Sequence, residues 1–255
     1  IRMRWLRILW VKLVGGIVGI GLGLSLGREG PSIQIGAVTA QGLSRALGRT
    51  RMEERYLITA GASAGLAAAF NAPLAGVMFA LEELHRNFSG VVLAPSMAAA
   101  LLATMVSRYV FGRAPVFHFG MLPPFPLRYM WLVVILGIII GLAGVVFNKG
   151  LLNIHYFYDL PVFRNNYMRI AFALCMAGIL GYVFPEVLGG GNDLVNSLYT
   201  LPLSLKLFAG LLIGKFLFTL VSYGCGVPGG FFLPMLVLGA LTGGITGIVF
   251  VHLGL

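Results

Sequence analysis

The sequence predicts an all-α integral membrane protein built from uneven, tilted and re-entrant helices. Hydrophobic residues make up 58% of the 255 positions and charged residues only 10%, whereas a soluble domain carries about 25% charged residues. The apolar residues form continuous runs rather than the alternating pattern of a membrane β-barrel. Gly and Pro interrupt several runs, and non-helical backbone at membrane depth is tolerated only where protein buries it or where it lines a cavity.

Seven apolar runs are expected to form the main helices. They lie at 5–26, 56–81, 91–107, 129–158, 167–185, 205–222 and 232–252. Because a spanning helix needs about 20 residues, the run at 129–158 is too long for an upright span and predicts a strongly tilted helix. A shorter, more polar helix is expected at 31–47, with loops at 112–126 and 158–166. We expect no soluble domain, and both ends of the chain look cut rather than finished.

The net charge of +10 comes from short basic clusters between the apolar runs. Such clusters are typical of helix ends that face anionic lipid headgroups. No basic patch is interleaved with aromatic residues as in a nucleic-acid interface. We therefore expect contact with membrane lipid and no nucleic-acid partner.

The stretch from Gly27 to Pro31 places two charges, Arg28 and Glu29, between long apolar segments. A charge near the bilayer midplane costs roughly 2.5–3.5 kcal/mol and marks a functional site by default. Gly27 and Gly30 allow a tight turn, and Pro31 suits the first position of a helix. A helix beginning at Pro31 would point its free N–H groups and positive dipole end back at Glu29. We interpret Glu29 as a tethered anion beside an anion site, whose protonation is coupled to anion binding.

A second Gly- and Pro-rich interruption runs from Gly226 to Pro234 and again leads into an apolar helix. Paired interruptions in corresponding parts of a chain are the best sequence indication of a transporter's binding site. The two stretches predict a weak internal repeat whose helix N-termini point at one place.

A short helix is expected from Pro73 to Glu82 and Glu83. These adjacent carboxylates diverge by about 100° on a helix, so they do not form a catalytic pair. A solvated helix end is the alternative to a functional role.

The spacing Glu82-x-x-His85 resembles half of a di-iron motif, but such sites need a second copy and two further glutamates. We expect no metal and no cofactor.

The segment Gly61-Ala62-Ser63-Ala64-Gly65 matches the G-x-S-x-G pattern of serine hydrolases, which makes an intramembrane hydrolase acting through Ser63 a rival hypothesis. That pattern requires a strand–turn–helix context, whereas this segment lies in an Ala-rich helical run. Small residues four apart are ordinary packing signals between membrane helices. The same interpretation is given to two further pairs, Gly137/Gly141 and Gly210/Gly214.

Three stretches resemble the CLC family of chloride channels and proton/chloride antiporters. They are Gly27-Arg28-Glu29-Gly30-Pro31, the segment from Gly61 to Glu83 with Asn71-Ala72-Pro73, and Gly230-Phe231-Phe232-Leu233-Pro234. The first and third resemble two of the family's three filter motifs, and the similarity extends over essentially the whole chain.

The resemblance implies a homodimer with an inverted internal repeat and one anion path per subunit. It assigns Glu29 to the gating glutamate, Glu83 to the inner proton-transfer glutamate, and the backbone amides of Phe231 and Phe232 to the central anion site. The family's third filter motif, a Gly-Ser-Gly-Ile-Pro loop, would precede residue 1, and its closing Tyr would follow residue 255. We therefore expect a partial CLC-type transmembrane domain over 1–255.

The resulting hypothesis is a chloride transporter rather than an enzyme, located in the plasma (inner) membrane. Having both Glu29 and Glu83 favours proton-coupled chloride exchange. A passive chloride channel is the alternative, because channels that resemble this family often lack the inner glutamate. The hydrolase hypothesis predicts a His close to Ser63 and activity lost in Ser63→Ala.

Overall fold

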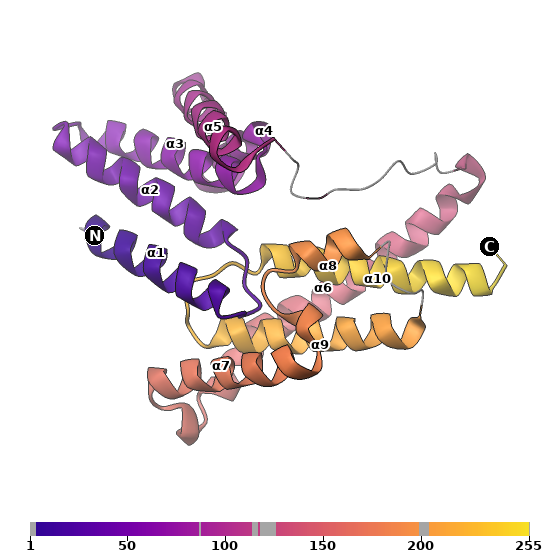
Figure 1. Cartoon of the computed structure of the whole chain (residues 1–255). Coiled ribbons are helices and arrows are strands. Elements are labelled where there is room, and N and C mark those ends of the chain that lie inside the picture. The colour runs from indigo at the N-terminus through magenta and orange to yellow at the C-terminus, as the bar shows by residue number, and fades with distance from the viewer. Residues whose placement is uncertain (1–3, 87, 114–116, 118–125, 199–203, 255) are drawn as a thin grey trace. The chain divides into compact units, whose positions relative to one another are not determined.

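The computed structural model describes residues 4–86, 88–113, 117, 126–198 and 204–254, and helices dominate them (Figure 1). The chain divides into two compact units. Unit 1 comprises residues 1–18, 28–116 and 228–230, and unit 2 comprises residues 19–27, 117–227 and 231–255. Both Gly-rich stretches identified in the sequence therefore contribute residues to each unit.

In unit 1, helices α2 (Glu29–Ala46) and α3 (Arg51–Phe70) lie side by side (Figure 1). Their backbones approach closely because glycines line the crossing. A Cβ placed on Gly36 would lie 2.1 Å from the Gly61 carbonyl oxygen, and one on Gly65 would lie 2.2 Å from the Ser32 carbonyl oxygen. Gly61 and Gly65 are thus packing residues, as predicted.

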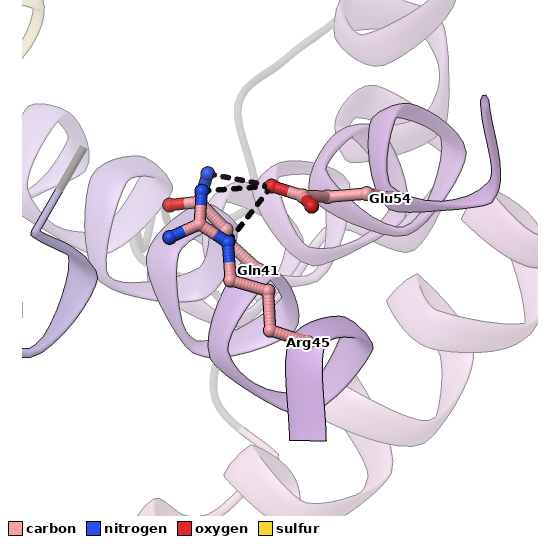
Figure 2. Close-up of polar contacts among 3 residues, drawn as sticks. All are labelled: Gln41, Arg45 and Glu54. Atoms are coloured by element: carbon pink, nitrogen blue, oxygen red, sulfur yellow. Dashed lines mark hydrogen bonds and ion pairs between the residues drawn. The ribbon is translucent and has the colours of Figure 1, made fainter. Parts of the chain in front are cut away.

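The N-terminus of α3 is fixed by side chains on both helices. Thr50 and Glu53 form a reciprocal capping box. The Oε1 atom of Glu54 accepts hydrogen bonds from Gln41 Nε2 at 2.8 Å and from Arg45 Nη2 at 3.1 Å (Figure 2). These contacts hold the pKa of Glu54 below its ordinary value, chiefly through Gln41 and then through Arg45. They connect the ends of α2 and α3 that lie away from Glu29.

The chain then breaks at Asn71, where the backbone is left-handed with φ 57°. Helix α4 (Pro73–Phe79) follows, as the Asn-Ala-Pro signal predicted. It continues into a π-helical turn, Ala80–His85, rather than ending as an ordinary helix at Glu83. Helix α5 (Gly90–Phe111) packs on α3 and completes the unit.

The described part of unit 2 contains five further α-helices and three short 3₁₀ turns. The helices are α6 (Met130–Tyr158), α7 (Asn166–Val183), α8 (Asn192–Ser197), α9 (Leu205–Gly224) and α10 (Phe232–His252); the turns are Leu127–Tyr129, Pro161–Phe163 and Pro185–Val187. Helix α9 packs against both α6 and α10. The fully buried Tyr158 ends α6, and its hydroxyl donates to the Val221 carbonyl of α9 at 2.7 Å.

Among the described residues, five helices are long and apolar enough to cross a membrane. They are Gly90–Phe111, Leu127–Tyr158, Asn166–Val183, Leu205–Gly224 and Phe232–His252. The predicted run at 5–26 instead gives α1 (Trp5–Gly21), which is 17 residues long, because the chain turns at Gly23 with φ 89°. Most of the predicted loop at 112–126 lies outside the described residues, and the loop at 158–166 contains a 3₁₀ turn.

Of the two remaining small-residue pairs, the packing prediction holds for Gly210/Gly214 and fails within the described residues for Gly137/Gly141. A Cβ on Gly214 would lie 3.2 Å from Val187, so the pair in α9 faces a neighbouring segment. Among the described residues, a Cβ on Gly137 or Gly141 would meet no atom within 4 Å. That prediction was wrong for contacts within this chain, because α6 presents this face outward.

Candidate functional site

The first Gly-rich stretch connects α1 to α2. The chain leaves α1 through the left-handed Gly23 and re-enters a helix at Glu29, two residues earlier than predicted from Pro31. The first intrahelical bond runs from the Ser32 amide to the Arg28 carbonyl at 3.0 Å. Pro31 sits inside this first turn without penalty, because amides there have no intrahelical acceptor. Glu29 is therefore the first residue of α2 rather than part of the preceding loop.

Glu29 is 4% exposed, and the backbone around it is tightly packed. A Cβ on Gly30 would lie 3.3 Å from Gly230 Cα and 3.5 Å from the Gly229 carbonyl oxygen. A carboxylate in the first turn of a helix is stabilised by the helix dipole. The structure thus places the buried carboxyl group of Glu29 at the N-terminus of α2. The next residue, Gly30, lies against Gly229 and Gly230 of the second Gly-rich stretch.

Within unit 1, helix α1 packs against the prolines of both Gly-rich stretches. A Cβ on Gly15 would lie 3.0 Å from the Pro228 ring, and one on Gly16 would lie 3.6 Å from the Pro31 ring. The absence of side chains at Gly15 and Gly16 lets both proline rings approach the helix. Within unit 1, residues 28–31 and 228–230 of the two Gly-rich stretches therefore both contact or adjoin α1, while the prediction that the two helix N-termini point at one place stays a prediction.

The second Gly-rich stretch repeats the local backbone of the first. Helix α9 ends at a turn through Gly226, whose φ of 83° matches the 89° of Gly23. Helix α10 begins at Phe232, and its first intrahelical bond joins the Met235 amide to the Phe231 carbonyl at 3.0 Å. Pro234 occupies the same place in its helix as Pro31 does in α2. The predicted internal repeat is confirmed for these two local backbones.

Phe231 and Phe232 lie at the start of α10, where first-turn amides point out of a helix. The two residues are 37% and 44% exposed. The Phe231 ring makes an edge contact with Tyr223, with centroids 5.4 Å apart. The next two residues, Leu233 and Pro234, are buried and anchor the turn in unit 2.

Arg28 points to the end of α3. Its Nη2 donates to the Ala69 carbonyl at 3.1 Å, a favourable position for a cation at a helix C-terminus. The nearby Asn71 is held by Arg108 of α5, whose Nε donates to Asn71 Oδ1 at 2.7 Å. Sequence reasoning missed Arg108, because nothing local in the sequence connects it to Asn71.

A cavity of about 750 Å³ adjoins Arg28 in unit 1. Arg28, Ser32, Asn71 and Ser107 supply its polar wall, and apolar residues near the C-terminal ends of α3 and α5 line most of the rest. We call it the Arg28 cavity. It gives the first turn of α2 a neighbouring space bordered by a guanidinium group.

Glu82 and Glu83 both lie in the π-helical turn and are exposed. Single π-helical turns occur frequently at functional sites, because the extra residue changes the direction of the side chains. The following Arg86 has a left-handed backbone, φ 52°, and the His85 ring lies 5.7 Å from the Tyr56 ring of α3. The turn thus places Glu83 at the surface of unit 1, while Glu29 is buried in the same unit.

Ser63 does not have the surroundings of a hydrolase nucleophile. It lies inside α3, is fully buried, and its hydroxyl donates to the Ser96 carbonyl at 3.3 Å. A nucleophile elbow would place it on a strand-to-helix turn. The structure therefore gives no support to the hydrolase hypothesis.

Comparison with known proteins identifies relatives over nearly the whole chain. A family model described as the voltage-gated chloride channel matches residues 1–255. The H⁺/Cl⁻ exchange transporter ClcA of Vibrio vulnificus (strain YJ016) is 36% identical over 248 residues, which cover 94% of this chain and 53% of the relative. ClcA of Salmonella agona (strain SL483) is 37% identical over 254 residues, covering 96% and 53%. The chain thus spans about half the length of the curated relatives it matches.

Solved structures show the same fold. A slow cyanobacterial Cl⁻/H⁺ antiporter matches with a TM-score of 0.90 and 33% identity, over 99% of this chain and 60% of that one. A CLC-type fluoride/proton antiporter matches with a TM-score of 0.72 and 25% identity, over 96% and 66%. The predicted all-helical, multi-pass membrane fold is confirmed. This chain belongs to the voltage-gated chloride channel family.

Proposed function

We propose that the protein exchanges chloride for protons across the plasma (inner) membrane, the activity after which its ClcA relatives are named. The observation that carries this proposal is the buried carboxyl group of Glu29 in the first turn of α2. Its neighbour Gly30 lies against the backbone of Gly229 and Gly230, just before Phe231 and Phe232. A titratable anion beside a helix N-terminus is what coupling a proton to an anion requires.

Chloride binds at backbone amides in this proposal: those of Phe231 and Phe232 at the start of α10, and those of the first turn of α2. Helix N-termini attract anions through unsatisfied N–H groups and the helix dipole. Neutral N–H donors can bind chloride and still release it, whereas a fixed positive charge would trap the anion. The filter residues on either side, Gly27 to Pro31 and Gly230 to Pro234, set the path of the backbone that presents these amides.

Glu29 acts as the gate in this cycle. Ionised Glu29 and chloride compete for one positive pocket, whereas a protonated side chain leaves the pocket to chloride. The binding of a proton and of chloride therefore become linked, and linkage is reciprocal. Glu83, exposed on the π-helical turn, passes protons between the aqueous phase and Glu29.

In this proposal, chloride enters the Arg28 cavity before it reaches its binding site. A guanidinium that lines a low-dielectric space raises the local anion concentration. The Arg28 side chain is held by its hydrogen bond to the Ala69 carbonyl, so its positive charge lies beside the proposed chloride path and not in the chloride-binding site.

The functional unit is a homodimer surrounded by membrane lipid. Beside the Arg28 cavity, α5 presents a stripe of exposed apolar side chains that do not line the cavity, including Leu101, Met105 and Tyr109. This stripe is our candidate for the contact with the second copy.

The test uses the natural full-length protein in liposomes, with proton movement followed while a chloride gradient is imposed. Wild type is compared with Glu29→Ala, Glu83→Gln and, as a matched control, the exposed carboxylate variant Glu186→Gln. We expect uphill proton movement in wild type and in Glu186→Gln. Glu29→Ala and Glu83→Gln should retain chloride flux and lose proton movement, because each removes one proton carrier.

Two outcomes would contradict the proposal in different ways. Chloride flux without proton movement in wild type would make the protein a passive channel with Glu29 as its gate only. The absence of both fluxes in folded wild-type protein would remove the transport assignment itself.

A further inference from the structure

Helix α9 carries a stripe of polar residues that the chloride cycle does not use. Lys215, Thr219 and Ser222 are each 0% exposed. Their spacing of four and three residues places them on one face of the helix. Since α9 is one of the five apolar candidate spans, a fully buried lysine in it requires a physical explanation.

The ammonium group of Lys215 is bound entirely by backbone carbonyls of one loop. Its Nζ donates to Val187 at 2.9 Å, Leu188 at 3.3 Å and Gly189 at 2.6 Å. An ammonium group has three N–H donors, so these three acceptors use its full capacity. The loop follows the 3₁₀ turn Pro185–Val187 and wraps the ammonium through Gly189 and Gly191, which have φ of 62° and 93°.

The same loop touches both Gly-rich stretches within unit 2. The Gly189 amide donates to the Gly23 carbonyl at 2.9 Å. A Cβ on Gly190 would lie 3.4 Å from the Leu26 carbonyl oxygen and 2.6 Å from Leu233 Cδ2. The loop held by Lys215 therefore lies directly against the residue before Gly27 and the residue after Phe232.

The rest of the stripe binds the first stretch directly. The Ser25 amide donates to Ser222 Oγ at 3.1 Å, and the hydroxyls of Ser25 and Thr219 lie 2.8 Å apart. One face of α9 thus fixes residues 23–26 at Ser25 and, through the loop, at Gly23 and Leu26.

We infer that Lys215 is a positioning residue for ion exchange. By gathering three carbonyls it fixes the loop at 187–191, and this loop sets the register of the segment that leads into Glu29 and of the turn that carries Phe231 and Phe232. The inference rests on the proposed function, but its consequence for chloride binding can be measured without any proton flux.

The experiment combines chloride binding by calorimetry in detergent with the chloride-to-proton ratio in liposomes, both on natural full-length protein that elutes as a folded species. Lys215→Met removes the ammonium. Gly190→Ala keeps the ammonium but adds a methyl group 2.6 Å from Leu233 Cδ2, so the packing between the loop and the turn that carries Phe231 and Phe232 must change. The matched control is Lys206→Met, which removes the same charge from an exposed position on the same helix.

Lys215→Met and Gly190→Ala should each weaken chloride binding roughly tenfold and alter the exchange ratio, since a misplacement of about 1 Å can cost up to about 100-fold at a site. Lys206→Met should match wild type in both measurements. Should Lys215→Met fail to fold, Gly190→Ala and Thr219→Val, which removes a stripe hydroxyl, decide the question.

Three results would overturn the inference. One is wild-type affinity and ratio in folded Lys215→Met. Another is a defect in Lys215→Met with wild-type behaviour in Gly190→Ala, because the lysine would then act through its charge rather than through the loop. The third, should Lys215→Met not fold, is wild-type affinity and exchange ratio in both Gly190→Ala and Thr219→Val. Wild-type protein that binds chloride but moves no protons would instead contradict the proposed function, with the affinity measurements still testing Lys215.

Discussion

Replacing Gly36 by Ala tests the close approach of α2 and α3 on which the position of Glu29 depends. The added methyl carbon would lie 2.1 Å from the Gly61 carbonyl oxygen, whereas real Cβ atoms essentially never come closer than 3.0 Å. The two helices must therefore separate by about 0.9 Å, the difference between these distances, at a point where both are close-packed. Neither contact atom is the end of a flexible side chain, so no rotamer change relieves the clash.

The magnitude follows from two opposing terms. Overpacking costs up to about 3 kcal/mol, and Ala in place of Gly favours the helix by about 1 kcal/mol. We expect a net loss of about 2 kcal/mol in the free energy of unfolding. For a domain of roughly 150–250 residues each kcal/mol shifts the melting temperature by about 2–4 °C, so Gly36→Ala should melt about 4–8 °C below wild type.

The assay is thermal unfolding in detergent at one fixed scan rate, followed by near-UV circular dichroism. Gly137→Ala is the matched control, because a Cβ there meets no described atom within 4 Å and only the favourable helix term remains. It should melt at or slightly above the wild-type temperature. A Gly36→Ala protein that melts at or above wild type would refute the reasoning, since the α2–α3 contact would then tolerate the methyl group.

Two further substitutions test local electrostatics and the hydrolase hypothesis. Glu54→Gln removes the carboxylate held by Gln41 and Arg45; because the pKa of Glu54 is lowered in the folded protein, its contribution of up to about 1 kcal/mol is present above the unfolded pKa and is lost as pH falls through the folded value. The variant should therefore melt below wild type at pH 7, and the gap should shrink as the pH falls below the ordinary pKa of a glutamate; a gap that stays constant with pH would contradict this. Ser63→Ala removes only the bond to the Ser96 carbonyl, so stability should change by no more than about 1 kcal/mol and ion flux should match wild type; loss of a measurable hydrolysis of ester substrates would instead restore the hydrolase hypothesis.

Much of the fold could be predicted from apolar runs and their interruptions. The run at 205–222 became α9 and the run at 232–252 became α10, within one or two residues. Long apolar segments bounded by Gly and Pro leave few alternatives in a membrane. The start of α2 was misplaced at Pro31, because proline is tolerated throughout the first turn and does not mark which position it occupies.

The candidate site was predictable where chemistry is local and missed where it depends on distant contacts. Glu29 stood out as a charge between apolar segments, and the structure buries it at a helix N-terminus. The carbonyl partners of Lys215 lie more than 25 residues away in the loop after Pro185, and no sequence period connects them. A charged residue inside the run at 205–222 was nevertheless a signal that could have been followed.

The use of Lys215 for structure fits the chemistry required of an ion exchanger. A binding site must attract its ion strongly enough to select it and release it quickly enough to turn over. A lysine with free N–H donors at a chloride site would bind chloride strongly but would slow its release. Here all three ammonium donors are used by the carbonyls of Val187, Leu188 and Gly189. At its binding site in the proposed cycle, chloride meets neutral amides and a glutamate that can be protonated, while the buried cation holds the backbone that presents the amides.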